Sequence, residues 1–170
     1  MTDLRAFLRG LRAEVRAKFN RRVSTGDLLT DRWELAREYG WGEGTSCYDN
    51  VLVIGDVKVG RNTWIGPNVV LDGSGGLEIG DNCSISSGVQ IYTHDTVEWA
   101  ISGGVEKPTY APTKIGSNTY IGPNSVIAKG VTVGTGVVIG SMSLVLHDIG
   151  DGQKAFGQPA RVRSGDRFDY

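Results

Sequence analysis

The sequence predicts an all-β solenoid, a parallel coil of short strands, and three observations carry this prediction. From residue 47 to residue 150 the chain divides into units of six residues, and fifteen such units can be aligned. The first place of the unit is Ile, Val or Leu in thirteen of the fifteen, and the second place is Gly in seven. Glycine makes up 25 of 170 residues without a collagen period, which indicates many turns between short repeated elements.

Two places of each unit are expected to face the interior of the coil. The fifth place of one unit and the first place of the next are two residues apart, so both side chains lie on the same side of a short strand. Cys47 occupies a first place and Cys83 a fifth place, so we expect both in the core rather than in a disulfide or at a zinc ion. The fifth-place residues are mostly small or β-branched: Val51, Val57, Thr63, Val69, Cys83, Val89, Thr113, Thr119, Ser125, Val131, Val137 and Ser143.

The fourth place of the unit predicts a sharp corner. Outside the irregular units that begin at Leu71 and Thr109, it is Asn, Gly or Asp in eleven of thirteen units. These residue types adopt a left-handed backbone conformation at the lowest cost. Three corners close a triangular turn of about eighteen residues, so the units make about five coils that bury one another's inner faces. The period does not fix the hand of the coil.

The residues before the coil follow a helical pattern. Apolar side chains recur at three- and four-residue steps over residues 3–20, with arginines on the other side, which predicts an amphipathic helix. A shorter helix is expected over residues 32–39. Asp31 can cap its N-terminus, with Glu34 three residues later, and Gly40 suits its end.

These changes of pattern divide the chain into three parts. Residues 1–46 form an N-terminal helical segment, and residues 47–150 form the β-helix. Residues 151–170 form a C-terminal segment that contains a Gly-Gln-Pro-Ala-Arg motif and a polar tail.

Charge and hydropathy narrow the classes of function. The formal net charge is −1, so no global field attracts nucleic acid. Residues 1–22 carry seven Arg and Lys against two acidic residues, a local +5 that leaves −6 for the rest. We favour packing of this basic helix on its own domain or on a trimer partner; weak contact with a membrane surface is the alternative. The sequence has no apolar run near eighteen residues and no signal-peptide pattern, so a cytoplasmic protein is expected.

His94 departs from the repeat. It takes a fourth place, in the unit IYTHDT, and the chain then leaves the repeat into a protruding loop at about 97–108. Loops on a rigid scaffold often carry functional residues, and a neutral imidazole can remove a proton near neutral pH. A histidine that the turn merely tolerates is the alternative reading. Asp95 could orient the imidazole, although neighbouring residues of a strand point in opposite directions.

The hexads IGDNCS, IGSNTY and IGPNSV, the segment YTHDT and the ending AFGQPARVR carry a resemblance to a known family. They resemble the hexapeptide-repeat acetyltransferases, most closely the maltose, galactoside and polysaccharide O-acetyltransferase branch, over roughly residues 47–163. The resemblance implies a left-handed parallel β-helix and a homotrimer with active sites between subunits. It also implies acetyl-CoA as co-substrate, no metal, and His94 as the catalytic base.

The resemblance also implies residues that bind coenzyme A. The Gly-x-Pro-Ala-Arg ending places a CoA-binding arginine on Arg161, whose guanidinium suits phosphate. Counting back without gaps adds Pro123, Ser141, Leu146 and His147. Pro123 stands where the family has a serine, and His147 where it has a lysine. An oxyanion donor would then be a backbone N–H nearby, such as that of Gly122 or Asn124.

On the acceptor side the sequence departs further from the family. The acidic residue that grips the sugar in the maltose and galactoside enzymes falls on Ser74, within the bulge DGSGG. This argues against the same free disaccharide or glucoside and favours a nucleotide- or lipid-linked sugar. Tyr92 is also expected on the substrate side, and Trp99 can stack on a sugar ring or pack against the neighbouring subunit.

The sequence therefore predicts an acetyl-CoA-dependent O-acetyltransferase that acts directly on a hydroxyl of a sugar or glycan precursor, in polysaccharide biosynthesis. One alternative is an N-acetyltransferase of a nucleotide-linked amino sugar, and another is a non-catalytic trimeric scaffold or binding module. A γ-type carbonic anhydrase shares the coil but needs three zinc-binding histidines, whereas only His94 and His147 are present.

Overall fold

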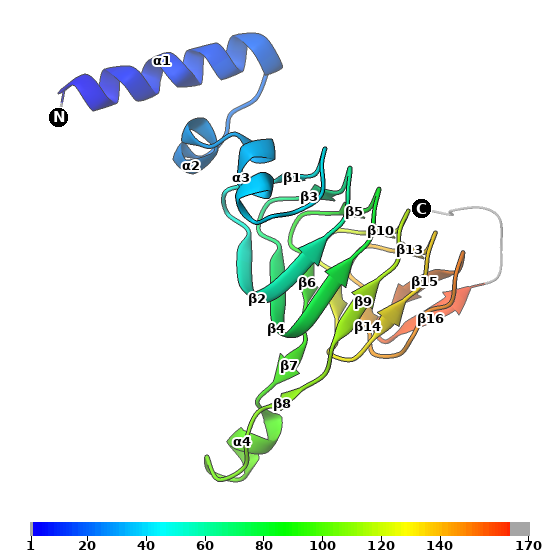
Figure 1. The fold of residues 1–170 in the computed structure, drawn as a ribbon. Helices are drawn as coiled ribbons and strands as arrows, with labels where there is room; N and C mark the ends of the chain where they lie inside the picture. Colours follow the sequence, from blue (N-terminus) through cyan, green and yellow to red (C-terminus); the bar gives the residue numbers. More distant parts are fainter. Residues whose placement is uncertain (1, 164–170) are drawn as a thin grey trace.

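A computed structural model describes residues 2–163 and contains a left-handed parallel β-helix with helices at its N-terminal end (Figure 1). The fold class predicted from the repeat is confirmed. The helices are α1 (Thr2–Phe19), α2 (Thr25–Leu29) and α3 (Arg32–Glu38). Of these, α3 packs against the first strand of the coil. The polar tail expected over residues 164–170 lies outside the described residues.

The helices begin and end at their capping residues. The Asp31 side chain accepts hydrogen bonds from the backbone N–H groups of Trp33 and Glu34, at 2.9 and 3.0 Å. After α3 the chain turns at Gly40, which has a φ of +72°. The helices predicted over 3–20 and 32–39 are thus confirmed as α1 and α3, whereas α2 was not expected.

The strands form the three faces of the coil. The first face stacks β1 (Ser46–Cys47), β3 (Trp64–Ile65), β5 (Ser84–Ile85), β10 (Tyr120–Ile121), β13 (Val138–Ile139) and β15 (Lys154–Gly157) in parallel. The second and third faces share β2 (Leu52–Val59) and β4 (Val70–Ile79), which turn the corner between them. The second face adds β6 (Gln90–Ile91), β11 (Val126–Ile127) and β14 (Leu144–Val145), and the third adds β9 (Thr113–Ile115) and β12 (Thr132–Val133).

The C-terminal segment extends the coil. β15 lies beyond the fifteen hexads, yet it continues the first face and gives that face six parallel strands. β16 (Ala160–Arg163) then folds back antiparallel on β15 and pairs Arg161 with Phe156. The segment expected to follow the β-helix therefore supplies its last turn.

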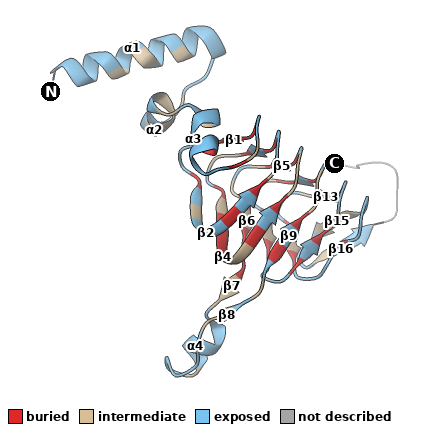
Figure 2. Ribbon diagram, in the orientation of Figure 1, coloured by how far each residue is buried: buried red, intermediate tan, exposed pale blue. Residues whose placement is uncertain are grey.

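The inward places of the repeat fill the core. The twelve fifth-place residues named above are all buried, and so are the thiols of Cys47 and Cys83, both of which are free. Several buried hydroxyls donate to carbonyl oxygens of the next coil; for example, Thr119 Oγ1 lies 3.0 Å from Gly134 O and Ser125 Oγ 2.8 Å from Gly140 O. Polar and apolar side chains therefore share this core, and no buried side-chain nitrogen or oxygen within residues 2–163 is left unpaired. Figure 2 shows the buried residues gathered inside the coil, whereas α1 and α4 (Val97–Ile101) are largely exposed.

The second place holds glycine because successive coils lie close together. A Cβ built on Gly116 would lie 2.5 Å from the carbonyl carbon of Gly134 in the next coil, and one on Gly122 would lie 2.5 Å from Ser141 N. Such distances leave no room for a side chain. Asp72 is one of the eight second-place residues that are not glycine, and it begins the bulge DGSGG in β4.

The corners have the expected left-handed backbone at most fourth places. Asn62, Asn68, Asn82, Asn118 and Asn124 have φ between 54° and 59°. His94 does not, because it lies in an extended strand, so the prediction that it occupies such a corner is wrong. Met142 does adopt this conformation, with a φ of 57°. It has neither the short polar side chain of asparagine nor the missing Cβ of glycine.

We expect Met142→Asn to raise the free energy of unfolding by about 1 kcal/mol, because asparagine adopts positive φ more readily than methionine. The methionine side chain is 60% exposed, so little packing is lost. Urea denaturation would measure the change, and Met142→Leu is the control that keeps the unfavourable backbone. If the asparagine variant is no more stable than the leucine variant, the positive φ at position 142 does not strain the backbone.

Candidate active site

An arm projects from the coil after the second face, as the sequence predicts for residues 97–108. β7 (His94–Asp95) and β8 (Thr109–Tyr110) pair antiparallel, and α4 (Val97–Ile101) lies between them at the tip (Figure 1). His94 pairs with Tyr110 across this ribbon, and their rings stack with centroids 5.9 Å apart. The base of the arm therefore holds the imidazole against the edge of the coil.

A buried carboxylate contacts this imidazole. Asp72 Oδ2 lies 2.6 Å from His94 Nδ1, and 3.1 Å from the backbone nitrogen of the same residue. The Asp72 side chain is fully buried, while that of His94 is 29% exposed. The two residues are 22 positions apart in the chain and lie on successive turns of the coil. The coil thus fixes one side of the ring and leaves the other accessible.

Hydrogen bonds keep the Asp72 carboxylate ionised. Burial by itself would raise the pKa of this carboxyl, but the bonds it accepts outweigh that effect and hold the pKa well below its usual value. Ser74 donates to Oδ1 through its hydroxyl, at 2.5 Å, and through its backbone N–H, at 3.0 Å. The Thr93 backbone N–H donates to Oδ2 at 2.8 Å. Asp72 therefore carries a negative charge at neutral pH.

The charge on Asp72 decides which nitrogen of His94 carries a proton. An ionised carboxylate only accepts hydrogen bonds, so Nδ1 must be the donor at 2.6 Å. In the neutral ring, Nε2 then has a free lone pair. Within residues 2–163 the structure gives Nε2 no hydrogen-bond partner, so it is available to accept a proton from a bound molecule.

Asp95 does not contact the imidazole. Its Oδ2 lies 2.8 Å from Lys129 Nζ, and its Oδ1 accepts from Val97 N and Thr109 Oγ1. The hydrogen bond from Lys129 lowers the pKa of Asp95 the most, and the bond from Val97 N lowers it further. Adjacent strand residues point in opposite directions, so Asp95 ties the arm to the coil while Asp72 takes the orienting place that was expected of Asp95.

The residues expected on the acceptor side lie around His94 to different degrees. Ser74 is exposed beside the Asp72 carboxylate, to which it donates. Tyr92 precedes the histidine by two residues, and its hydroxyl donates to Gln90 Oε1 at 2.7 Å. Trp99 lies in α4, at the tip of the arm, and is 50% exposed.

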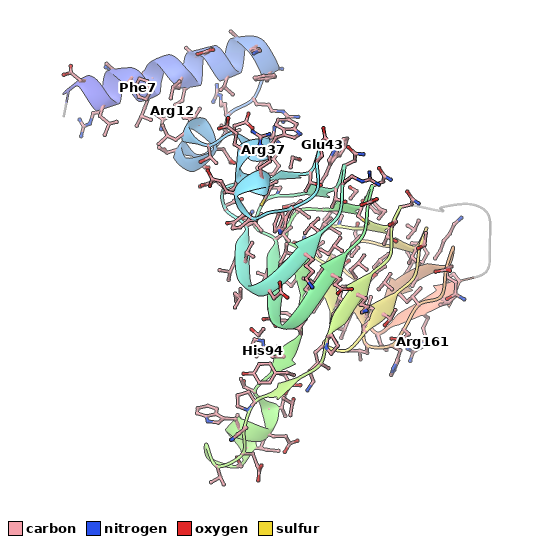
Figure 3. The ribbon with its side chains drawn as sticks, in the orientation of Figure 1. Phe7, Arg12, Arg37, Glu43, His94 and Arg161 are labelled. Carbon is pink, nitrogen blue, oxygen red and sulfur yellow. The ribbon has the colours of Figure 1, made fainter. Side chains whose placement is uncertain are left out.

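The residues expected to bind coenzyme A fall on two edges of the coil and one hairpin. Leu146 and His147 are exposed just after β14, on the edge where the arm leaves two turns earlier. Pro123 and Ser141 lie on another edge, after β10 and β13, where Pro123 O accepts from Met142 N. Arg161 is exposed on β16, and Figure 3 shows it far along the coil from His94. One protomer therefore places Leu146 and His147 on the edge that carries His94, and Pro123, Ser141 and Arg161 elsewhere.

The expected oxyanion donors are engaged in the coil. Gly122 N donates to Ile139 O at 2.8 Å, and Asn124 N donates to Ser87 O at 3.0 Å. Both bonds belong to the stacking of successive turns, so neither N–H is free to stabilise a developing oxyanion. The expectation that one of them serves in this role is therefore corrected.

The two thiols are unsuited to nucleophilic chemistry. Burial raises the pKa of Cys47 to about 12 and also raises that of Cys83. Both lie within the coil, away from any surface a substrate can reach. A transfer at this site would therefore not pass through a cysteine intermediate.

Asp72 is the residue that the sequence analysis missed. It lies two residues before Ser74, onto which the ungapped count placed the family's acidic residue. One signal was present: a carboxylate occupies a second place, where the repeat otherwise favours glycine. The two extra residues of the bulge hid it, because they shift the count within that unit.

Comparisons with known proteins agree with this fold. A family model described as the bacterial transferase hexapeptide, six repeats, matches residues 112–147. A second, described as the hexapeptide repeat of succinyl-transferase, matches residues 56–93. No curated protein matches the sequence.

Solved structures give the same result. The acetyltransferase domain of PglB from Neisseria gonorrhoeae is 20% identical with a TM-score of 0.58; the match covers 72% of this chain and 50% of that one. AntD, an N-acyltransferase from Bacillus cereus in complex with dTDP and 3-hydroxybutyryl-CoA, is 24% identical with a TM-score of 0.67. That match covers 75% of this chain and 72% of that one. This chain thus spans half the length of the PglB domain structure, and at these identities the likeness is one of fold.

Proposed function

We propose that this chain, which matches two hexapeptide-repeat transferase models, is an acyltransferase that moves an acetyl group from acetyl-CoA to a hydroxyl of a sugar or glycan precursor. The observation that carries this proposal is the pair of Asp72 and His94, with 2.6 Å between Oδ2 and Nδ1. The pair resembles the base and orienting acid of many acyl-transfer sites, where a carboxylate fixes the tautomer of the histidine.

The transfer is direct. His94 Nε2 takes the proton of the acceptor hydroxyl while that oxygen attacks the thioester carbonyl carbon. The carbon–sulfur bond then breaks, and the proton passes from the imidazolium to the departing thiolate. Asp72 stays ionised throughout, holds Nδ1–H and stabilises the positive ring. General base catalysis of this kind contributes roughly 10²–10⁴-fold.

A homotrimer would complete the site. In one protomer Arg161 and Pro123 lie away from the arm, so a neighbouring subunit would have to present such groups to His94. Leu146 and His147 lie on the same edge as the imidazole and would contact the pantetheine and phosphate side of coenzyme A. This division of the expected residues between edges supports active sites shared by two subunits.

The acceptor would be a nucleotide- or lipid-linked sugar in polysaccharide biosynthesis. Asp72 is engaged with Thr93 and His94, so it is not free to grip a sugar hydroxyl, and Ser74 replaces the acid expected there. Transfer to a nitrogen is the second candidate. It is favoured by AntD, because the structure of a point mutant of that protein has been determined with dTDP-4-amino-4,6-dideoxyglucose and coenzyme A.

Thiol release from acetyl-CoA separates these functions. We expect release with hydroxyl-bearing sugar acceptors and none with the matching amino sugars. Turnover only with nucleotide-linked amino sugars would replace O-transfer by N-transfer. A scaffold would show no binding of acetyl-CoA by calorimetry, and that result would overturn the proposal as a whole.

A further inference from the structure

Helix α1 carries apolar side chains that the described residues of the protomer leave largely exposed. It extends beyond α2 and α3, away from the coil (Figure 1), and packs chiefly against α2. Leu4 is 61% exposed and Phe7 is 56% exposed, and Figure 3 shows Phe7 on the outer part of the helix. Eighteen residues at 1.5 Å each make a face about 27 Å long. An exposed patch of this kind marks an interaction surface.

The same segment carries unneutralised positive charge. A cavity of about 420 Å³ between α1 and α2 is lined by Arg12, Arg16, Arg21 and Arg22, with apolar side chains between them. Arg12 Nη2 donates to Thr25 Oγ1, a neutral group, at 3.2 Å. None of the four arginines forms an ion pair with a described residue. Four guanidinium groups around one cavity repel one another unless an external anion neutralises them.

We infer that α1 and the arginine cavity bind the surface of an anionic phospholipid membrane. The apolar face would enter the boundary between headgroups and acyl chains, and the arginines would contact lipid phosphates. No helix within residues 2–163 is long and apolar enough to cross a bilayer, so the contact is with its surface. The alternative, pairing of α1 with the same helix of a second copy, would bring two +5 segments together.

This inference is independent of the acetyl transfer proposed above. α1 lies at the N-terminal end of the coil, whereas the arm with His94 leaves from a later turn (Figure 3). Loss of one property therefore leaves the other intact, and the two can be tested separately on the full chain.

Cosedimentation with vesicles tests the inference. We expect the full chain to bind phosphatidylcholine vesicles that contain phosphatidylglycerol, and to bind them less tightly as the salt concentration rises. It should not bind vesicles of phosphatidylcholine alone. Arg12→Gln with Arg16→Gln should weaken the partition about tenfold or more. Phe7→Gln should weaken it as well, because it removes an inserted ring.

A matched control removes the same charge elsewhere. Lys58→Gln with Lys114→Gln neutralises two exposed lysines of the coil and should leave vesicle binding unchanged. Equal loss in both double variants would overturn the inference, since net charge alone would then explain binding. Two other results would also overturn the inference. One is saturable binding of inorganic phosphate without binding of vesicles. The other is that neither the wild type nor the Phe7→Gln variant binds vesicles, while the substitution changes the oligomeric state.

Discussion

Replacing His94 with alanine should lower kcat for acetyl transfer by roughly 10²–10⁴-fold, the usual contribution of a general base. Within residues 2–163 the imidazole Nε2 has no hydrogen-bond partner, while Nδ1 is held by Asp72 at 2.6 Å. Removal of the ring leaves the acceptor hydroxyl without a proton acceptor. Steady-state thiol release from acetyl-CoA measures the loss.

Controls distinguish loss of the base from loss of the fold. The alanine variant should keep the oligomeric state of the wild type and its affinity for acetyl-CoA. The His94 side chain is 29% exposed and is not part of the core of the coil. Free imidazole in the buffer should restore part of the rate, whereas Lys58→Gln, which removes a lysine paired with Asp56, should need no rescue. Turnover within a few-fold of wild type for His94→Ala would remove the general-base mechanism.

Replacing Asp72 with asparagine should both weaken the fold and reduce transfer. The carboxylate is fully buried and accepts bonds from Ser74, Thr93 and His94. An asparagine side chain has an NH2 group in place of one carboxylate oxygen. This group cannot accept hydrogen bonds, so some of these donors would be left unpaired. We expect the free energy of unfolding to fall by about 3 kcal/mol. Urea denaturation measures this change.

The effect of Asp72→Asn on catalysis should appear in kcat more than in KM. An amide can donate to Nδ1, which would place the proton on Nε2 and leave the ring unable to act as a base. We expect kcat to fall about a hundredfold or more. The Ser74→Ala variant is the matched control, because it removes only one donor to the same carboxylate. It should retain most of the rate, and a comparable loss there would assign Asp72 a merely structural role.

The pKa of Asp72 predicts how this stability depends on pH. The native pKa is lowered, so the carboxylate stabilises the fold above the unfolded value of about 3.9, and that stabilisation is lost as the pH falls toward the native pKa. The difference in unfolding free energy between wild type and Asp72→Asn should therefore be constant above about pH 5 and shrink below about pH 4. A difference that stays constant down to pH 3 would show that the charge is not involved.

The sequence by itself determined the coil, because each feature of the coil follows from a local rule repeated in every unit. The second-place glycines are needed where backbones of successive turns come within van der Waals contact, as at Gly116. The fourth-place asparagines provide positive φ, and the first and fifth places alternate toward the core. None of these rules requires knowledge of a distant residue. The same locality made His94 visible, since it breaks the fourth column.

Tertiary structure alone decided what His94 touches. A turn of the coil brings Asp72 to the ring across 22 positions, and the bulge in β4 adds two residues that no repeat count can place. Sequence order favoured Asp95, but the alternation of a strand sends that carboxylate to Lys129. Local periodicity can specify which side chains face inward, whereas the meeting of two side chains depends on the registry between turns. That registry exists only once the coil is closed.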